Sequence, residues 1–143
     1  MADVKIIDID NEQWNMKDQT ARDSISALKT QLATDNTYST SEVKTSKKWI
    51  NGKPIYRKVV ETGSLPNNSQ VGYNHNIANA EFFITIRGIA KSTSLFLPIP
   101  FVERNGSTNI QLYASANSFT VSTNYNASSY NGTFIFEYTK TTD

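Results

Sequence analysis

The residue types that carry most enzyme chemistry are scarce in this sequence. It has one histidine, His75, and no cysteine. A catalytic triad would need an activated serine beside that imidazole, and no Gly-x-Ser-x-Gly turn occurs. Zinc sites generally use several histidine or cysteine ligands. We therefore expect neither a metal nor another cofactor, and we interpret His75 as a loop or turn residue, with contact to a ligand as the alternative.

Glycoside hydrolysis is the remaining enzymatic alternative, because it needs only two carboxylates set several ångströms apart across a cleft. The glutamates of the C-terminal part lie singly, mostly near the ends of expected strands. They are Glu42, Glu61, Glu81, Glu103 and Glu137. Solvated glutamates are ordinary at such positions. The sequence therefore predicts a protein that is not an enzyme.

Tyrosine and asparagine cluster in two expected loops, where they are suited to binding saccharide. An aromatic face covers the C–H surface of a sugar, and amides bond its hydroxyls; loops on a rigid sheet commonly carry recognition. The candidate ligand-binding residues are Tyr73, His75, Tyr113, Tyr125, Asn126 and Tyr130, with Asn74, Asn76 and Asn131 beside them. The alternative is that asparagine serves the backbone here, since it tolerates positive φ.

A basic run surrounds Trp49 and Tyr56. It comprises Lys44, Lys47, Lys48, Lys53, Arg57 and Lys58. A nucleic-acid site would combine such charge with exposed aromatic rings in a groove. Because the formal net charge of the chain is only +1, we favour a solvated hairpin with its aromatic residues turned inward, and we expect no nucleic-acid partner.

The N-terminal part has the pattern of a helix that meets identical helices. Asp10 and Gln13 form a capping-box pattern, and Ile9 can pack on Trp14. From about residue 11 to about residue 33, apolar residues occupy the a and d positions of a heptad, with Asp18 interrupting the series. These oligomerisation residues are Trp14, Ala21, Ile25, Leu28 and Leu32. We expect a left-handed cap at Asn36 and a short coiled-coil stem, trimeric by preference; packing of the helix on its own domain is the alternative.

After residue 36 the pattern alternates with the period of strands. Asn51-Gly52 between two apolar stretches predicts a hairpin. The other expected strands are 56–61, 71–77, 80–91, 95–103, 109–114, 118–123 and 132–139. In the last of them Phe134, Phe136 and Tyr138 share one face, and in 80–91 we expect Phe82, Ile84 and Ile86 on the core side. Pro98 and Pro100 predict an edge strand or an extended connection.

Composition and charge divide the chain into two parts. Hydrophobic residues are 38% of the sequence, which suits a small β domain with many turns. Acidic residues dominate positions 1–36, and the basic excess lies after them. We therefore predict a helical stem over 1–36 and an antiparallel β-sandwich head over 37–143. The N-terminus lacks a signal-peptide pattern and no segment is apolar enough to span a bilayer, so we expect synthesis in a cytoplasm and no membrane insertion.

The head resembles a module of tail-fibre and baseplate proteins from phages and prophages of Gram-positive bacteria. The resemblance rests on the segments Tyr38–Lys44, Trp49–Val60, Leu65–Asn68 and Phe136–Lys140, with Tyr130, and covers most of 38–143. It implies a trimeric protein of the virion that contacts other tail or baseplate proteins and binds a host cell-surface saccharide. A purely structural adaptor and, third, a polysaccharide depolymerase are the alternatives. A full fibre has a long shaft before this module, whereas here one expected helix precedes it.

Overall fold

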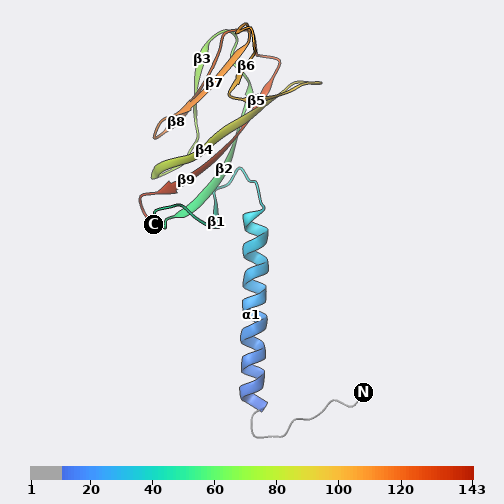
Figure 1. Ribbon diagram of the computed structural model, residues 1–143, viewed down its shortest axis with the longest axis vertical. Helices are drawn as coiled ribbons and strands as arrows, with labels where there is room; N and C mark the ends of the chain where they lie inside the picture. The colour runs from blue at the N-terminus through green and yellow to red at the C-terminus, as the bar shows by residue number, and fades with distance from the viewer. Residues whose placement is uncertain (1–10) are drawn as a thin grey trace.

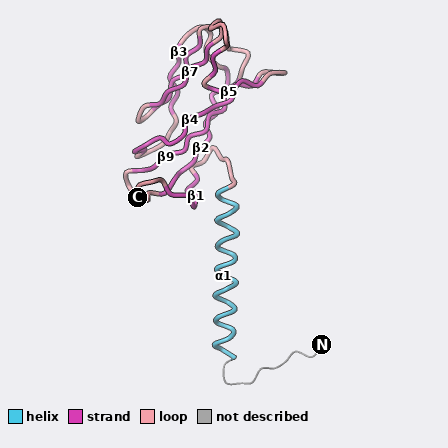
Figure 2. Tube along the Cα trace, viewed as in Figure 1, coloured by secondary structure: helices cyan, strands magenta, loops and turns pink. Residues whose placement is uncertain are grey.

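The computed structural model describes the backbone of residues 11–143 and the side chains of residues 19–143. Within that part, one long helix is followed by strands only (Figures 1 and 2). The elements are α1 (Asn11–Asp35), β1 (Val43–Lys48), β2 (Pro54–Ser64), β3 (Gln70–Asn74), β4 (Ala80–Lys91), β5 (Phe96–Ile99), β6 (Phe101–Val102), β7 (Asn109–Ala114), β8 (Ser118–Thr123) and β9 (Asn131–Lys140).

The strands form two antiparallel sheets, which confirms the prediction of a mainly β chain. One has five strands in the order β1-β2-β9-β4-β5, and the other has four in the order β3-β8-β7-β6. β5, which contains Pro98, is an edge strand of the first sheet, as its prolines predicted. The central strand β9 pairs with β2 on one side and β4 on the other, so it organises the five-stranded sheet.

The core lies between the two sheets and is built around aromatic rings. Phe134, Phe136 and Tyr138 of β9 are fully buried, so the predicted apolar face of this strand is confirmed. They meet Phe119 of β8, whose ring centroid lies 4.9 Å from that of Phe134 and 5.1 Å from that of Phe136. Because rings of the two sheets meet, the sheets pack face to face in a sandwich-like arrangement.

The predicted core face of β4 is wrong for Phe82. Its side chain is 52% exposed, whereas Phe83 packs against Phe136 at a centroid distance of 5.9 Å. The register of β4 with β9 shifts between Ala80 and Phe82 and again between Phe83 and Thr85. An irregularity of this kind changes which side chains of the strand point inward, so strict alternation could not assign the face.

The β1–β2 hairpin confirms the prediction at Asn51-Gly52. The N–H of Gly52 donates to the carbonyl of Trp49, and the N–H of Trp49 donates to the carbonyl of Lys53, both at 2.8 Å. Gly52 has φ of +81°, which is the left-handed conformation that a three-residue hairpin loop requires. Trp49 stacks on Phe82 at a centroid distance of 5.8 Å.

Helix α1 projects away from the sheets and does not lie along them (Figure 1). It ends at Asp35, two residues later than predicted. Asn36 does not adopt positive φ; instead its side-chain amide donates to the carbonyl of Leu32 at 3.0 Å, so the expected left-handed cap is replaced by a side-chain cap. The predicted N-cap Asp10 lies outside the described residues, and the side chain of Trp14 is likewise not described. No helix in the described part is long and apolar enough to cross a membrane.

The C-terminal end of α1 is tied to the five-stranded sheet through Arg57 of β2. The guanidinium donates to the carbonyl oxygens of Asp35 at 2.9 Å and Thr37 at 3.4 Å. The same group forms an ion pair with Glu137 of β9 at 2.9 Å. The carboxylate of Asp35 in turn accepts bonds from the N–H and hydroxyl of Ser46 in β1. Charged donors at the last carbonyls also suit the negative end of the helix dipole.

Two strand glycines provide a matched test of how tightly the sheets pack. A Cβ at Gly88 of β4 would lie 2.6 Å from Cδ1 of Phe134, whereas a Cβ at Gly72 of β3 would meet nothing within 4 Å. Gly88→Ala is expected to destabilise the protein by about 1–3 kcal/mol through overpacking. Gly72→Ala is expected to be neutral or slightly stabilising, because it limits the freedom of the unfolded chain. Urea unfolding measures both, and equal free energies of unfolding would contradict the described packing.

Candidate functional site

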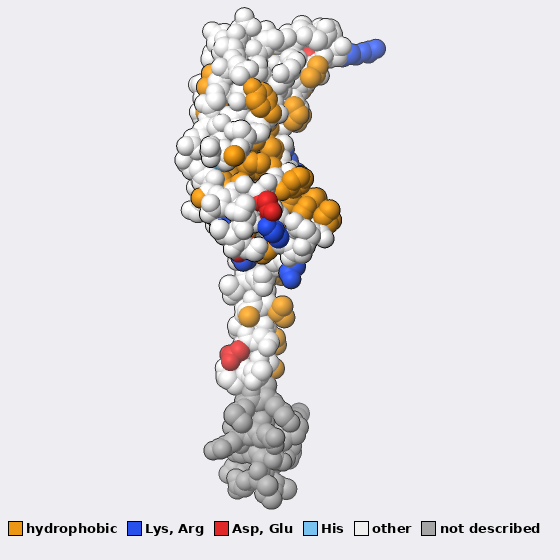
Figure 3. Space-filling view, turned by 90° about the vertical axis from the view of Figure 1, so that its left-hand side faces the viewer, with side chains coloured by type: hydrophobic (Ala, Val, Ile, Leu, Met, Phe, Trp, Pro, Cys, Tyr) orange, Lys and Arg blue, Asp and Glu red, His pale blue; other side chains and the backbone are white. Residues whose placement is uncertain are grey.

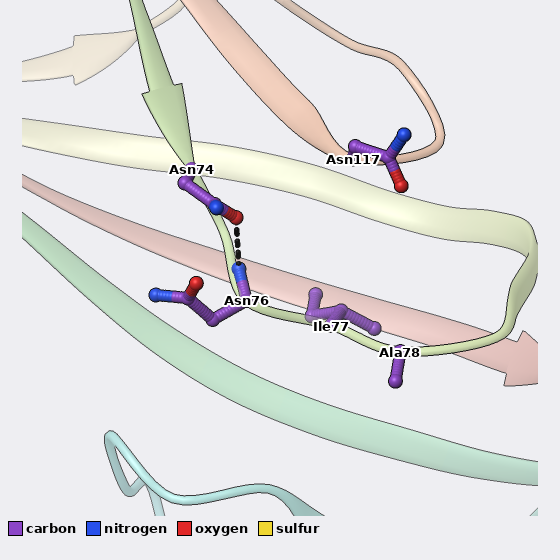
Figure 4. A pocket seen from close by; sticks show the side chains of 5 residues that line it. All are labelled: Asn74, Asn76, Ile77, Ala78 and Asn117. Carbon is purple, nitrogen blue, oxygen red and sulfur yellow. Dashed lines mark hydrogen bonds between the residues drawn. The ribbon is translucent and has the colours of Figure 1, made fainter.

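A surface pocket of about 440 Å³ lies beside the loop between β3 and β4. It is lined by Asn74, Asn76, Ile77, Ala78 and Asn117 (Figure 4), and we call it the asparagine pocket. Asn74 is the last residue of β3, the next three lie in the β3–β4 loop, and Asn117 lies in the turn between β7 and β8. The two segments meet because Asn74 pairs with Ser118 in the β3–β8 register. The lining therefore combines amide groups with two aliphatic side chains.

Asparagines also shape the β3–β4 loop itself. The side-chain oxygen of Asn74 accepts a bond from the N–H of Asn76 at 2.8 Å, shown as a dashed line in Figure 4. Asn76 and Asn79 adopt positive φ, at +50° and +59°, a conformation that asparagine tolerates better than most residues. The side-chain amides of Asn76 and Asn117, by contrast, make no hydrogen bond with any described residue. They are therefore the groups of the pocket that are most available to a ligand.

His75 lies in the loop between β3 and β4, which confirms its interpretation as a loop residue. It is buried, at 1% exposure, so its ring is not open to a ligand at the surface. Nδ1 accepts a bond from the N–H of Ile77 at 3.1 Å, and Nε2 lies 3.3 Å from the carbonyl oxygen of Ser115. An imidazole that accepts at one nitrogen and donates at the other is neutral. Its edge also contacts Phe83 at a centroid distance of 5.5 Å. The ring thus joins the β3–β4 loop to the β7–β8 turn and positions both walls of the asparagine pocket.

The surroundings of His75 favour the uncharged ring. Burial holds the pKa of His75 below its ordinary value, while the bond to the Ser115 carbonyl opposes that shift and the nearby charge of Lys58 adds to it. The Lys58 ammonium donates to the carbonyl of Asn76 at 2.8 Å. A cation already held against the loop makes protonation of the imidazole less favourable.

The six predicted ligand residues are not brought together. Tyr73 is half-buried, stacks on Phe119 at 5.4 Å and donates to the carbonyl of Ser64 at 3.4 Å, so it belongs to the packing of the sandwich. Burial raises the pKa of its phenol. Tyr113 of β7 is 49% exposed, but it lies on the outer side of the four-stranded sheet, since its neighbours Leu112 and Ala114 pack on the core.

Tyr125, Asn126 and Tyr130 occupy the opposite end of the sheet from the asparagine pocket. The β7–β8 turn precedes β8, and these three residues follow β8. Both tyrosines are partly buried against the core, and burial raises the pKa of Tyr125. The Asn126 side chain accepts a bond from the N–H of Ser128 at 3.1 Å, a local turn of the kind that asparagine commonly makes.

Asn117, Ile77 and Ala78 are the pocket residues that the sequence did not single out. Asn117 lies between two strands that were predicted correctly, so its place in a turn could have been inferred. Its proximity to Asn74 could not, because it depends on the pairing of β3 with β8, two strands separated by more than forty residues.

Three of the five glutamates considered for glycoside hydrolysis form ion pairs within the head. Glu137 pairs with Arg57, Glu81 with Lys53 at 2.5 Å, and Glu42 with Lys140 at 2.6 Å. Glu42 also accepts a bond from the hydroxyl of Tyr138 at 2.5 Å. Among the described residues no group of three or more histidine, cysteine or carboxylate side chains is placed to hold a metal ion.

Comparison with known proteins found no matching protein-family model, no matching curated protein and no matching solved structure. The fold and the pocket define the chain as a mainly β head on a projecting helix, with an amide-rich pocket at one end of the sandwich.

The buried neutral imidazole predicts a pH dependence of stability. The unfolded ring takes up a proton near its ordinary pKa of 6.5, whereas the folded ring resists protonation to lower pH. The contribution of His75 is therefore complete above about 6.5 and is lost as pH falls below that value. Urea midpoints at about pH 7.5 and about pH 5.5 should differ for the natural chain, and His75→Gln should be less stable but show a smaller difference. An equal difference in both proteins would contradict this assignment.

Proposed function

We propose that this chain is a homo-oligomeric phage tail or baseplate protein, whose helices form a stem and whose heads bind host cell-surface saccharide. Trimer is the preferred state. The proposal agrees with the resemblance of the head to tail-fibre and baseplate modules. Its partners would be further copies of itself, other tail proteins and a cell-wall saccharide.

The observation that carries the proposal is the uncovered apolar stripe of α1. Ile25, Leu28 and Leu32 are 52%, 68% and 63% exposed, and Ala21 is exposed on the same series. Figure 3 shows hydrophobic side chains along one edge of the helix. Steps of four, three and four residues keep these positions on one helix face. A projecting helix that leaves such a face in water is explained by other helices covering it.

The asparagine pocket supports saccharide binding by the head. The Asn117 amide offers both donors and an acceptor, which can pair with sugar hydroxyls. Ile77 and Ala78 add aliphatic surface to the lining. Because His75 fixes the two walls of the pocket, a ligand would not have to order them on binding.

A structural adaptor, which binds other tail proteins and no sugar, is the second candidate. One observation favours it: the five residues that line the asparagine pocket include no aromatic ring, and the predicted tyrosines lie elsewhere. Stacking of an aromatic ring on a sugar is the main apolar contribution expected in a saccharide site. Binding measurements on the natural chain distinguish the two candidates.

Substitution in the stripe should weaken self-association. Leu28→Glu places a charge in the proposed helix contact, and we expect at least a tenfold weaker association in sedimentation equilibrium. Thr30→Glu is the matched control, because Thr30 is exposed on α1 and lies on the opposite side of the helix from the stripe. A natural chain that stays monomeric at all concentrations, or equal effects of the two substitutions, would contradict the helical stem.

Binding should depend on Asn117. With purified cell-wall polysaccharides of Gram-positive bacteria as probes, the natural chain is expected to bind saturably. Asn117→Ala should weaken that binding about 2- to 10-fold, the equivalent of one neutral hydrogen bond. Asn131→Ala, an exposed asparagine beside the opposite loop, should leave it unchanged. No saturable binding to polysaccharide from any tested host would favour the adaptor, and a loss confined to Asn131→Ala would place the site at the other loop.

A further inference from the structure

We infer that the outer face of the five-stranded sheet is a second contact between copies of this chain, continuous with the contact along the helices. The inference rests on the proposed self-association and adds the surface through which the heads meet. We call this surface the outer sheet face. It comprises the side chains of β2, β9, β4 and β5 that point away from the core.

The outer sheet face carries large apolar side chains that stay about half exposed, although Trp49 stacks on Phe82 and the Lys91 ammonium lies over the Phe96 ring. Phe82 and Ile89 of β4 and Phe96 of β5 are 52%, 47% and 63% exposed. Their neighbours along the strands, Phe83 and Ala90, point into the core. The next strands of the sheet add the half-buried side chains of Ile135 in β9 and Val59 in β2, which pair in register. Ile89 and Phe96 lie on adjacent strands, whereas Thr85 and Arg87 separate Phe82 from Ile89 along β4. Several large exposed apolar side chains on one side of a sheet indicate an interaction surface.

The helix is joined to the molecule on this same face. Arg57 pairs in register with Glu137, and both belong to the outward series of their strands, since their neighbours Tyr56, Phe136 and Tyr138 are core residues. The Arg57 guanidinium reaches the carbonyl of Asp35 at the end of α1. In Figure 3 hydrophobic side chains line the same edge of the helix and of the head. A bundle formed through the helix stripe therefore brings the outer sheet faces of its members toward a common axis.

Symmetry identifies the occupant as a second copy of the chain. Helices related by rotation carry identical heads at identical heights, so each outer sheet face meets another head and not an unrelated surface. The charges on the face suit a rotational arrangement. Arg87 of β4 and Glu61 of β2 are exposed, form no ion pair with any described residue, and lie on either side of β9. Arg87 of one head can then face Glu61 of the next.

The contact is between faces and not between strand edges. β5 ends the sheet on one side, and its Pro98 has no N–H to donate to an added strand. Edge-to-edge pairing on that side is therefore disfavoured, whereas burial of Phe82, Ile89 and Phe96 would stabilise the association of faces.

Two matched positions test the inference on the full-length chain. Ile89→Glu changes the outer sheet face, and Tyr113→Glu changes the outer side of the other sheet at nearly the same exposure, 47% against 49%. Ile89→Glu should raise the dissociation constant of the oligomer at least tenfold in sedimentation equilibrium, and Tyr113→Glu should leave it within about twofold. Circular dichroism of both variants checks that they keep their strands.

A second measurement avoids introducing charge. Because the chain has no cysteine, Ile89→Cys and Tyr113→Cys each carry a single thiol. Labelling of the thiol at position 89 by a maleimide should slow as the protein is concentrated into its oligomer, while labelling at 113 should not. If the natural chain associates but substitutions at 89 and 113 have equal effects in both experiments, the outer sheet face is not an interface. The proposal that the helices form a stem would then still stand. If the natural chain never associates, the inference and the stem are both overturned.

Discussion

The arrangement of the molecule depends on the burial of one positive charge, that of Arg57. Removing a guanidinium from water is unfavourable by several kcal/mol unless its donors are satisfied. Here the Glu137 carboxylate, two carbonyl oxygens at the end of α1 and the Tyr38 ring, 4.5 Å from the guanidinium carbon, together surround it. These partners come from the end of α1, the linker after it and the central strand β9. The Arg57 guanidinium therefore joins the helix, the linker and the central strand, and loss of any one partner would leave the buried charge less well compensated.

Further polar contacts join the linker, the strands and the C-terminus at the end of the sandwich nearest the helix. The Tyr138 hydroxyl, on a fully buried ring, donates to Glu42 of the linker, and the Tyr56 hydroxyl donates to Asp143 at the C-terminus. Lys140 pairs with Glu42 and lies over the Tyr56 ring at 5.0 Å. Chain segments at both ends of the head thus converge where α1 begins to project. The β3–β4 loop of the asparagine pocket lies near this end too, since Lys58 donates to the carbonyl of Asn76 and the N–H of Thr141 donates to the carbonyl of Asn79.

Local signals in the sequence predicted the elements well, because helices and strands report their own periodicity. The long N-terminal helix, the Asn51-Gly52 hairpin and the inward face of Phe134, Phe136 and Tyr138 could all be predicted from neighbouring residues. The errors concern non-local information. The irregularities of β4, which place Phe83 and not Phe82 in the core, arise from its pairing with β9. The buried His75 lies against the carbonyl of Ser115, forty residues away in the sequence. The pocket likewise required Asn117, whose position is set by strand pairing.

The contacts of Arg57 with the end of α1 and with β9 would affect how the heads of an oligomer are placed relative to a cell surface. A joint with several simultaneous bonds leaves each head little freedom to swivel on its helix, so the pockets of one assembly would keep fixed spacings. Repeating ligands on a polymer could then occupy several pockets at once, and each later contact would form at a high effective concentration. If the proposed saccharide binding holds, avidity of this kind would compensate for a pocket that has few hydrogen-bonding groups and binds weakly when used singly.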